Sequence, residues 1–233
     1  AKKLMTEDQY AQEFECSWTA NISGSVYGKI IQRMEDEKRI SHYPYDPGYP
    51  VDVYFDLGIS DQTCLLFTQQ IGRALFVIDC YNNSNQSLDH YADYVKKTNY
   101  NIRNYVFPHD VEQRELSTGH SRKEYAFSMG MRPIKVCPKL SIEDGLHAGQ
   151  ILLAKSYIDR SSCKPFLDAM KWYHRKWIDK QKIFSKPVHD HSSHYADAWR
   201  VAAVAIQELD LNQNKRMEKL ATGTNYNPLE VRI

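Results

Sequence analysis

The sequence predicts an α/β fold in which a mixed β-sheet is flanked by helices. Three segments rich in β-branched and aromatic residues follow one another from Val51, with only short turns between them. Beyond them, helical patterns alternate with short apolar segments, which is typical of crossover connections that lay helices on a sheet. With 233 residues and 42% apolar residues, the chain is long enough for one domain with a substantial core.

The N-terminal region is predicted to be helix and linker. "TEDQYAQEFEC" offers Thr6 as an N-cap with acidic residues in the first turn, and "YGKIIQRMEDEKRI" is amphipathic. The run "HYPYDPGYP" then interrupts any regular element, because proline lacks the amide donor and restricts the residue before it. We therefore expect a helical linker segment over residues 1–48.

A three-stranded meander and a fourth strand follow. The segments "VDVYFDLGI", "TCLLFTQQI" and "ALFVIDCYN" are separated by turns at "SDQ" and "GR". "SLDHYADYVKK" is predicted as a helix with Ser87 as its N-cap, and "NIRNYVFPHD" as a strand that ends in a loop.

The second half continues the alternation of helices and strands. We expect a helix over 119–129, a strand in "RPIKVCP", and a helix over "SIEDGLHAGQILLAKSYI" that Ser141 caps. "CKPFLDAMKWYHRKWIDKQKIFSKP" is rich in basic and aromatic residues. A last helix, capped by Ser193 and ending near Glu208, completes a predicted domain over 49–210, and 211–233 is expected to be a polar C-terminal tail.

Composition excludes several classes of protein. The formal net charge of +1, with 30 basic and 29 acidic residues, argues against a polybasic binder. The five cysteines are scattered and form no C-x-x-C pair, which argues against a zinc knuckle and favours a reducing, intracellular setting. No apolar run approaches the length of a membrane span and the first residues lack a signal-peptide core, so we expect a soluble, cytoplasmic protein with no membrane partner.

Two acidic residues are expected at the ends of neighbouring strands. Asp56 lies at the end of the first strand of the meander, on the face opposite Phe55, because successive side chains alternate. Asp110 follows the fourth strand. If these two strands are parallel neighbours, both carboxylates lie at one edge of the sheet.

A third acidic residue lies on the last helix. In "HDHSSHYADAWR", helical spacing places His194, Asp197 and Val201 on one stripe that otherwise faces the core. A carboxylate there is costly unless its desolvation is offset, and a cation shared with Asp56 and Asp110 would offset it. Three carboxylates suit hard ions, so the sequence predicts two Mg²⁺ or Mn²⁺ ions that could promote phosphodiester hydrolysis.

Each residue taken alone also has a structural interpretation. Asp56 can cap a turn, and Asp110 can be a loop acid. Asp61 is better explained as a turn residue, close enough to the site for an indirect contact with the metals. His189 and His191 are better explained as polar loop groups, or as partners of the metal ligands, than as direct ligands. "GSVYGKI" resembles a phosphate-binding loop but has the wrong glycine spacing and no preceding strand, so we expect no bound nucleotide.

The blocks "DLGISDQT", "FPHD" with "TGHSRKEYAFSMGMRPIKVCPKLSIEDGLHAGQILLAKSYID", and "HDHSSHYADAWR" together resemble the nuclease domain of large terminase subunits from tailed double-stranded-DNA bacteriophages. The similarity covers roughly residues 10–208. It implies a ribonuclease H-like mixed β-sheet flanked by helices, and a metal-dependent endonuclease that cuts concatemeric DNA. By position, the family's metal-binding residues correspond to Asp56, Asp110 and Asp197, and His194 matches a histidine near the metals in some members.

The resemblance also implies partners. In that family these are double-stranded DNA, the portal protein, the small terminase subunit and an N-terminal ATPase domain of the same chain, in the cytoplasm of the host cell. No ATPase domain is visible here, so the chain is expected to be an excised nuclease domain. A junction resolvase, or a non-catalytic module that docks on DNA or a capsid, are the alternatives. Helical spacing would put Lys171 and Arg175 of the basic-aromatic segment on one face, which on charge alone could equally be a solvated helix surface. The candidate DNA contacts in this segment are Lys171, Arg175, Lys176, Lys180 and Lys182.

Overall fold

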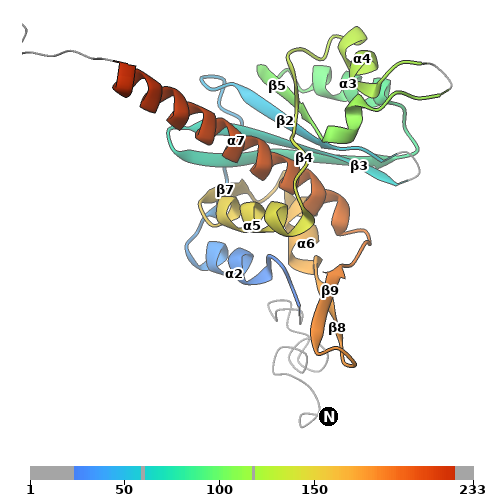
Figure 1. Cartoon of the computed structure of the whole chain (residues 1–233), viewed down its shortest axis with the longest axis vertical. Helices are drawn as coiled ribbons and strands as arrows, with labels where there is room; N and C mark the ends of the chain where they lie inside the picture. Colours follow the sequence, from blue (N-terminus) through green and yellow to red (C-terminus); the bar gives the residue numbers. More distant parts are fainter. Residues whose placement is uncertain (1–23, 59–60, 117–118, 224–233) are drawn as a thin grey trace, which may run out of the picture.

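The computed structural model describes residues 24–58, 61–116 and 119–223, with side chains described up to Glu208. A seven-stranded sheet lies at its centre in the order β1-β7-β4-β3-β2-β5-β6 (Figure 1). β3 runs antiparallel to both of its neighbours, and every other pairing in this sheet is parallel. The predicted mixed sheet flanked by helices is thus confirmed.

The central strands follow the sequence pattern closely. The predicted meander consists of β2 (Val51–Asp56), β3 (Gln62–Ile71) and β4 (Ala74–Ser84). The outer strands are β5 (Ile102–Phe107), β6 (Ile134–Val136), β7 (Ser156–Asp159) and β1 (Ile40–Ser41). β5 pairs parallel with β2, so the two strands that precede Asp56 and Asp110 are the parallel neighbours that the sequence analysis required.

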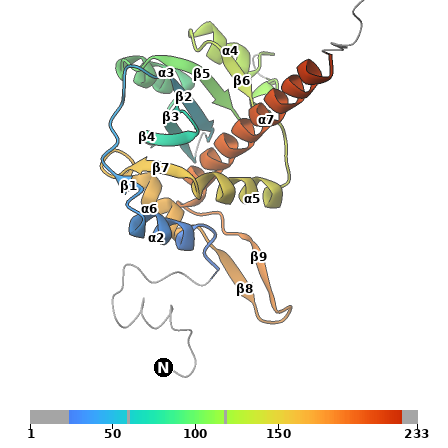
Figure 2. The same cartoon turned by 90° about the vertical axis from the view of Figure 1, so that its left-hand side faces the viewer.

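Helices cover both faces of the sheet (Figure 2). α3 (Leu88–Lys97) and α4 (Arg122–Ser128) pack on the face that receives Val53 and Phe55. The opposite face receives Tyr54 and packs against α2 (Gly28–Asp36), α5 (Ile142–Leu153), α6 (Lys164–Trp172) and α7 (Ser193–Gly223). The alternation along β2 therefore places Asp56 on the α7 side, as predicted.

Two helix predictions were too long. The helix expected over 141–158 ends at Leu153, and Ser156–Asp159 forms β7 instead. This segment adds a parallel strand beside Leu75–Val77 of β4, a long-range pairing that overrides local helix propensity. The helix expected over 119–129 begins only at Arg122, because Ser121 and Glu124 form a capping box.

The last helix was predicted too short. α7 continues past Glu208 to Gly223, so the first part of the predicted tail is helical, and 224–233 lies outside the described residues. Ser193 is the first helical residue rather than the cap, and its hydroxyl donates to the Asp190 carbonyl at 2.7 Å.

The basic-aromatic segment is not one helix. α6 ends at Trp172, and a hairpin of β8 (Arg175–Ile178) and β9 (Ile183–Pro187) projects from the domain (Figure 1). The prediction that one helical face carries Lys171 and Arg175 is therefore wrong, because Lys171 lies in α6 and Arg175 begins β8. The chain leaves the helix because its backbone pairs elsewhere: the Arg175 amide donates to the Gly24 carbonyl at 3.0 Å.

The N-terminal region is described only in part. Thr6 and its predicted helix lie outside the described residues, as does Cys16. α2 buries Ile31 and Met34 in the core beneath the sheet, and β1 extends the sheet beside β7. The predicted boundary at residue 48 stays a prediction. None of the described helices combines the length and the apolar character needed to cross a membrane.

Candidate metal centre

The three predicted carboxylates share one cavity. Asp56, Asp110 and Asp197 all line a hollow of about 290 Å³ between the sheet edge, α5 and α7. They come from β2, from the 3-10 turn η1 (His109–Glu112) and from α7, far apart in the sequence. The fold therefore brings together the residues that the sequence analysis selected.

A short turn holds Asp56 at the cavity. Gly58 donates its amide to Thr63 Oγ1 at 3.0 Å, and the same hydroxyl donates to the Gly58 carbonyl at 2.8 Å. A Cβ on Gly58 would lie 2.9 Å from the Gln62 carbonyl oxygen, so the close turn requires glycine. Burial raises the pKa of Asp56, and its contact with His194 partly offsets that rise.

Asp110 carries an unsatisfied buried oxygen. Its Oδ1 is buried and has no hydrogen-bond partner among the residues that the structure describes. A buried carboxylate oxygen without a partner is costly, because it gives up its hydrogen bonds to water and gains nothing in exchange. A bound cation would satisfy this oxygen, which is the observation that fits the cavity to a metal.

Asp197 lies on the inner side of α7. Burial raises its pKa to about 6, although the Arg200 guanidinium, whose Nη2 lies 3.1 Å from Asp197 Oδ1, acts in the opposite direction. The neighbouring Asp56 charge raises the pKa further. The free cavity therefore holds mutually repelling acids that a divalent ion would bind.

His194 lies between two acids. Its Nδ1 is 3.6 Å from Asp56 Oδ2 and its Nε2 is 3.4 Å from Asp61 Oδ1. The contact with Asp56 is the main cause that raises the pKa of this imidazole, against the effect of its burial. Protonated His194 thus acts as a counter-ion between Asp56 and Asp61 when no metal is bound.

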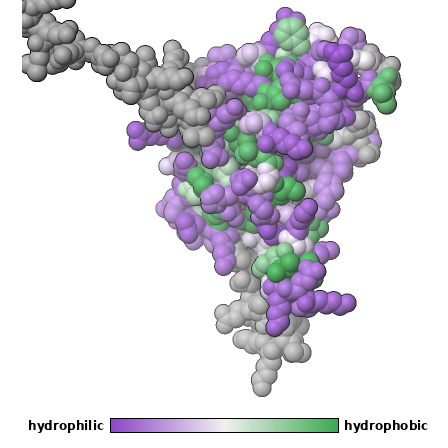
Figure 3. Space-filling model, viewed as in Figure 1, coloured by the Kyte–Doolittle hydropathy of each residue, from purple (hydrophilic) through white to green (hydrophobic). Residues whose placement is uncertain are grey.

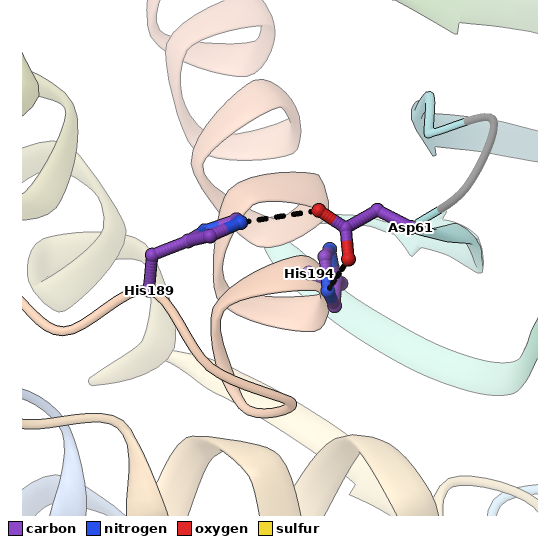
Figure 4. A group of neighbouring side chains, drawn as sticks. All are labelled: Asp61, His189 and His194. Carbon is purple, nitrogen blue, oxygen red and sulfur yellow. Dashed lines mark hydrogen bonds and ion pairs between the residues drawn. The ribbon is translucent and has the colours of Figure 1, made fainter.

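A chain of polar contacts continues outward from His194 (Figure 4). His189 Nε2 lies 3.2 Å from Asp61 Oδ2, and His189 Nδ1 lies 3.0 Å from the Ser193 hydroxyl. Donor atoms of Asp61, His189 and His194 all lie within 4.8 Å of one another. His189, in the loop before α7, and His194, on α7, therefore both contact Asp61.

Two sets of donors could hold ions here. The carboxylates of Asp56, Asp110 and Asp197 are hard oxygen ligands of the kind that Mg²⁺ and Mn²⁺ prefer. The set of Asp61, His189 and His194 includes imidazoles, which suit Mn²⁺ or softer ions better than Mg²⁺. The carboxylate set fits the predicted ions.

The raised pKa of Asp197 predicts a stability effect. Between the unfolded value near 3.8 and about 6 the folded protein binds more protons, so the free energy of unfolding falls as pH rises through this window. Asp197→Asn should therefore stabilise the metal-free protein at pH 7 by on the order of 1–3 kcal/mol, and much less at pH 4. Thermal melts in chelator at both pH values measure the difference between the variant and the wild type. An equal change in melting temperature at pH 7 and pH 4 would contradict this prediction.

The predicted DNA-binding residues are not equivalent. Lys171 Nζ lies 3.6 Å from Glu35 Oε1, and Arg175 Nη2 lies 2.7 Å from Glu143 Oε2, so both are paired with acids. Exposed lysines on the hairpin have no acidic partner among the described residues: Lys176, Lys180 and Lys182.

One residue at the site, Arg200, received no role from the sequence. It lies in the quoted motif "HDHSSHYADAWR", and its spacing of three from Asp197 was the available signal. His189 was interpreted as a loop group or a partner of the metal ligands, and the folded chain shows that its contact is with Asp61.

No family model matches the sequence, and neither does any curated protein. Solved structures do match. The large terminase from a thermophilic bacteriophage aligns with a TM-score of 0.59 at 17% identity, over 79% of this chain and 45% of that one. The P22 large terminase nuclease domain aligns with a TM-score of 0.55 at 18% identity, over 73% of this chain and 89% of that domain. The large terminase nuclease from thermophilic phage G20c with bound magnesium aligns with a TM-score of 0.53 at 11% identity, over 78% of this chain and 97% of that one.

This chain has the fold of large terminase nuclease domains. The expected ribonuclease H-like fold is thereby confirmed. The matched part spans less than half of the first of these large terminases and nearly all of the P22 and G20c nuclease domains. The likeness covers the terminase nuclease region.

Proposed function

We propose that this protein is a metal-dependent DNA endonuclease that cuts concatemeric double-stranded DNA during viral genome packaging. The observation that carries the proposal is the meeting of Asp56, Asp110 and Asp197 in one cavity, where a buried Asp110 oxygen has no hydrogen-bond partner within the described part of the chain. The same fold in a terminase nuclease that has bound magnesium supports it.

The roles of the side chains follow from their places. Asp56, Asp110 and Asp197 would hold two Mg²⁺ or Mn²⁺ ions, which when bound would activate water and stabilise the leaving oxygen of a phosphodiester. Asp56 ends β2 beside the turn that Thr63 closes, and Asp197 lies near the start of α7. His194 can pass a proton toward Asp61, which is exposed to solvent.

Metal dependence tests the proposal most directly. Plasmid nicking should be abolished by chelator and restored by Mg²⁺ or Mn²⁺. Ca²⁺ should bind but support only slow cleavage, because its looser coordination positions water poorly. Cleavage that persists in chelator would overturn the mechanism. A strong preference for branched over linear duplexes would indicate a junction resolvase, and metal binding without any cleavage would indicate a docking module.

The β8–β9 hairpin is the proposed DNA contact. Its exposed lysines, Lys176, Lys180 and Lys182, lie beside the exposed aromatic pair Trp177 and Phe184, whose ring centroids are 5.0 Å apart. Figure 3 shows apolar surface next to hydrophilic surface where the hairpin projects. β9 leads directly into the loop of His189, so the hairpin adjoins the candidate centre.

Replacing Lys176, Lys180 and Lys182 together by alanine should weaken duplex binding and flatten its salt dependence. The slope of log K against log salt should fall by about 1 for each lysine that neutralises a phosphate. A matched control replaces three exposed lysines elsewhere: Lys96, Lys97 and Lys155. Anisotropy titrations at several salt concentrations measure both slopes, and equal slopes for the two triple variants would exclude the hairpin as a DNA contact.

We further propose that the protein acts in the cytoplasm of the host cell as part of a larger assembly. Its partners would be the ATPase domain, the portal protein and the small terminase subunit. The thermophilic large terminase, of which this chain matches only 45%, supports a partner domain for the nuclease fold.

A further inference from the structure

Arg200 is a basic side chain built into the wall of the carboxylate cavity. It lines the cavity together with Asp197 and Lys139, but Lys139 is exposed, whereas the Arg200 side chain is only 28% exposed. Its Nη2 lies 3.1 Å from Asp197 Oδ1. The guanidinium is thus held next to a proposed metal ligand.

Gly145 on α5 makes room for this side chain. A Cβ at Gly145 would come within 2.5 Å of Arg200 Cδ and 2.6 Å of Cγ, so the aliphatic part of Arg200 lies directly across the helix backbone at this glycine. Gly145 itself is buried near the start of α5 and lines the same cavity. Glycine lowers helix stability relative to alanine. Its presence here is explained by the close approach of Arg200, which leaves no room for a Cβ.

With metal ions bound, the site would carry excess positive charge that favours an anion beside Arg200. In the free protein the guanidinium offsets part of the charge of Asp56 and Asp197. With two divalent ions on three carboxylates, that negative charge is already more than balanced, and Arg200 adds a further positive charge. A phosphodiester is the anion that such a site would take, and guanidinium donors match its non-bridging oxygens.

We propose that Arg200 is a substrate-binding residue that contacts the phosphodiester to be cleaved, held in place by Gly145. The inference rests on the proposed nuclease function. The competing explanation is an ordinary ion pair within α7, three residues apart, which contributes little to stability and nothing to DNA affinity.

The test compares Arg200→Ala, Arg200→Lys and, as a matched control, Arg160→Ala, which removes an ion pair with Glu35 outside the cavity. Duplex affinity is measured by fluorescence anisotropy in Ca²⁺ and in chelator, cleavage in Mg²⁺, and metal affinity by Mn²⁺ titration. In Ca²⁺, Arg200→Ala should weaken duplex binding about 10-fold and cleavage about 10- to 100-fold, the scale of removing a charge-assisted hydrogen bond. Arg200→Lys should restore part of the affinity. Mn²⁺ affinity should be unchanged or tighter.

Gly145→Ala tests the placement without changing any charge. The added methyl group should displace Arg200 and reduce cleavage toward the level of Arg200→Ala, while the melting temperature does not fall. In the Arg200→Ala background the methyl group has room, so Gly145→Ala should cause no further loss.

Failure of the wild-type protein to cleave in any metal would reject the nuclease function itself. Wild-type cleavage together with unchanged duplex affinity and cleavage in Arg200→Ala would reject only the role of Arg200. A Mn²⁺ affinity lowered more than 10-fold in Arg200→Ala would show instead that Arg200 positions Asp197, and would overturn the phosphate contact.

Discussion

Asp56→Asn, Asp110→Asn and Asp197→Asn should each reduce DNA cleavage by about 10²–10⁴-fold. Each change keeps the shape of the side chain and removes a charge that would bind a cation, and metal-supplied stabilisation of the transition state amounts to several kcal/mol. The three residues line one cavity from three separate elements, so each would contact the ions from a different side. Plasmid nicking under saturating Mg²⁺ measures the loss.

The control for these variants is Asp93→Asn, on the exposed side of α3. The control should cleave at the wild-type rate. The three site variants should remain folded, because removing one of several repelling carboxylates relieves an unfavourable charge in the metal-free protein. A site variant that cleaves at the wild-type rate would remove that residue from the proposed centre.

His194→Ala should reduce the cleavage rate by about 10²–10⁴-fold, the usual scale of general acid–base assistance. Its ring contacts Asp56 on one side and Asp61 on the other, so it connects the carboxylate cavity with an exposed acid. If His194 transfers a proton, Mn²⁺ affinity should stay unchanged and the pH–rate profile should flatten near neutral pH. If His194 binds a metal, the variant should lose Mn²⁺ affinity most.

Cleavage rates against pH and Mn²⁺ concentration distinguish these roles. His147→Ala, which replaces an exposed histidine on α5, serves as the matched control. Combining His194→Ala with Asp61→Asn adds a second readout, because residues that act in one proton path should show non-additive losses. An unchanged rate, metal affinity and pH profile would leave His194 with a structural role only.

Much of the fold followed from periodicity in the sequence. The alternation of Val51, Val53 and Phe55 with polar residues predicted both the strand β2 and the face on which Asp56 lies. These predictions for β2 succeeded because the period of two is a local property that a buried strand imposes on its own residues. The meeting of Asp56 and Asp110 was expected only if their strands were parallel neighbours, a condition that the pairing of β2 with β5 meets.

Predictions that depended on segment ends were less accurate. The residues of β7 resemble the end of a helix locally, and they form a strand only because β4 offers an unpaired edge. Lys171 and Arg175 were expected on one helical face, whereas pairing of the backbone with residues near Gly24 begins the hairpin at Arg175. Local propensity differs by less than the free energy of such long-range contacts, so it cannot decide these boundaries.

The candidate site divides in the same way. Residue type and spacing selected Asp56, Asp110, Asp197 and His194 as candidates on elements that could converge. Tertiary packing decided which neighbours complete the site: His189 reaches Asp61 from a loop, and the Arg200 side chain packs on Gly145 of another helix. The physical reason is that periodicity fixes the direction of a side chain relative to its own element, whereas the side chain's partners depend on how separate elements pack together.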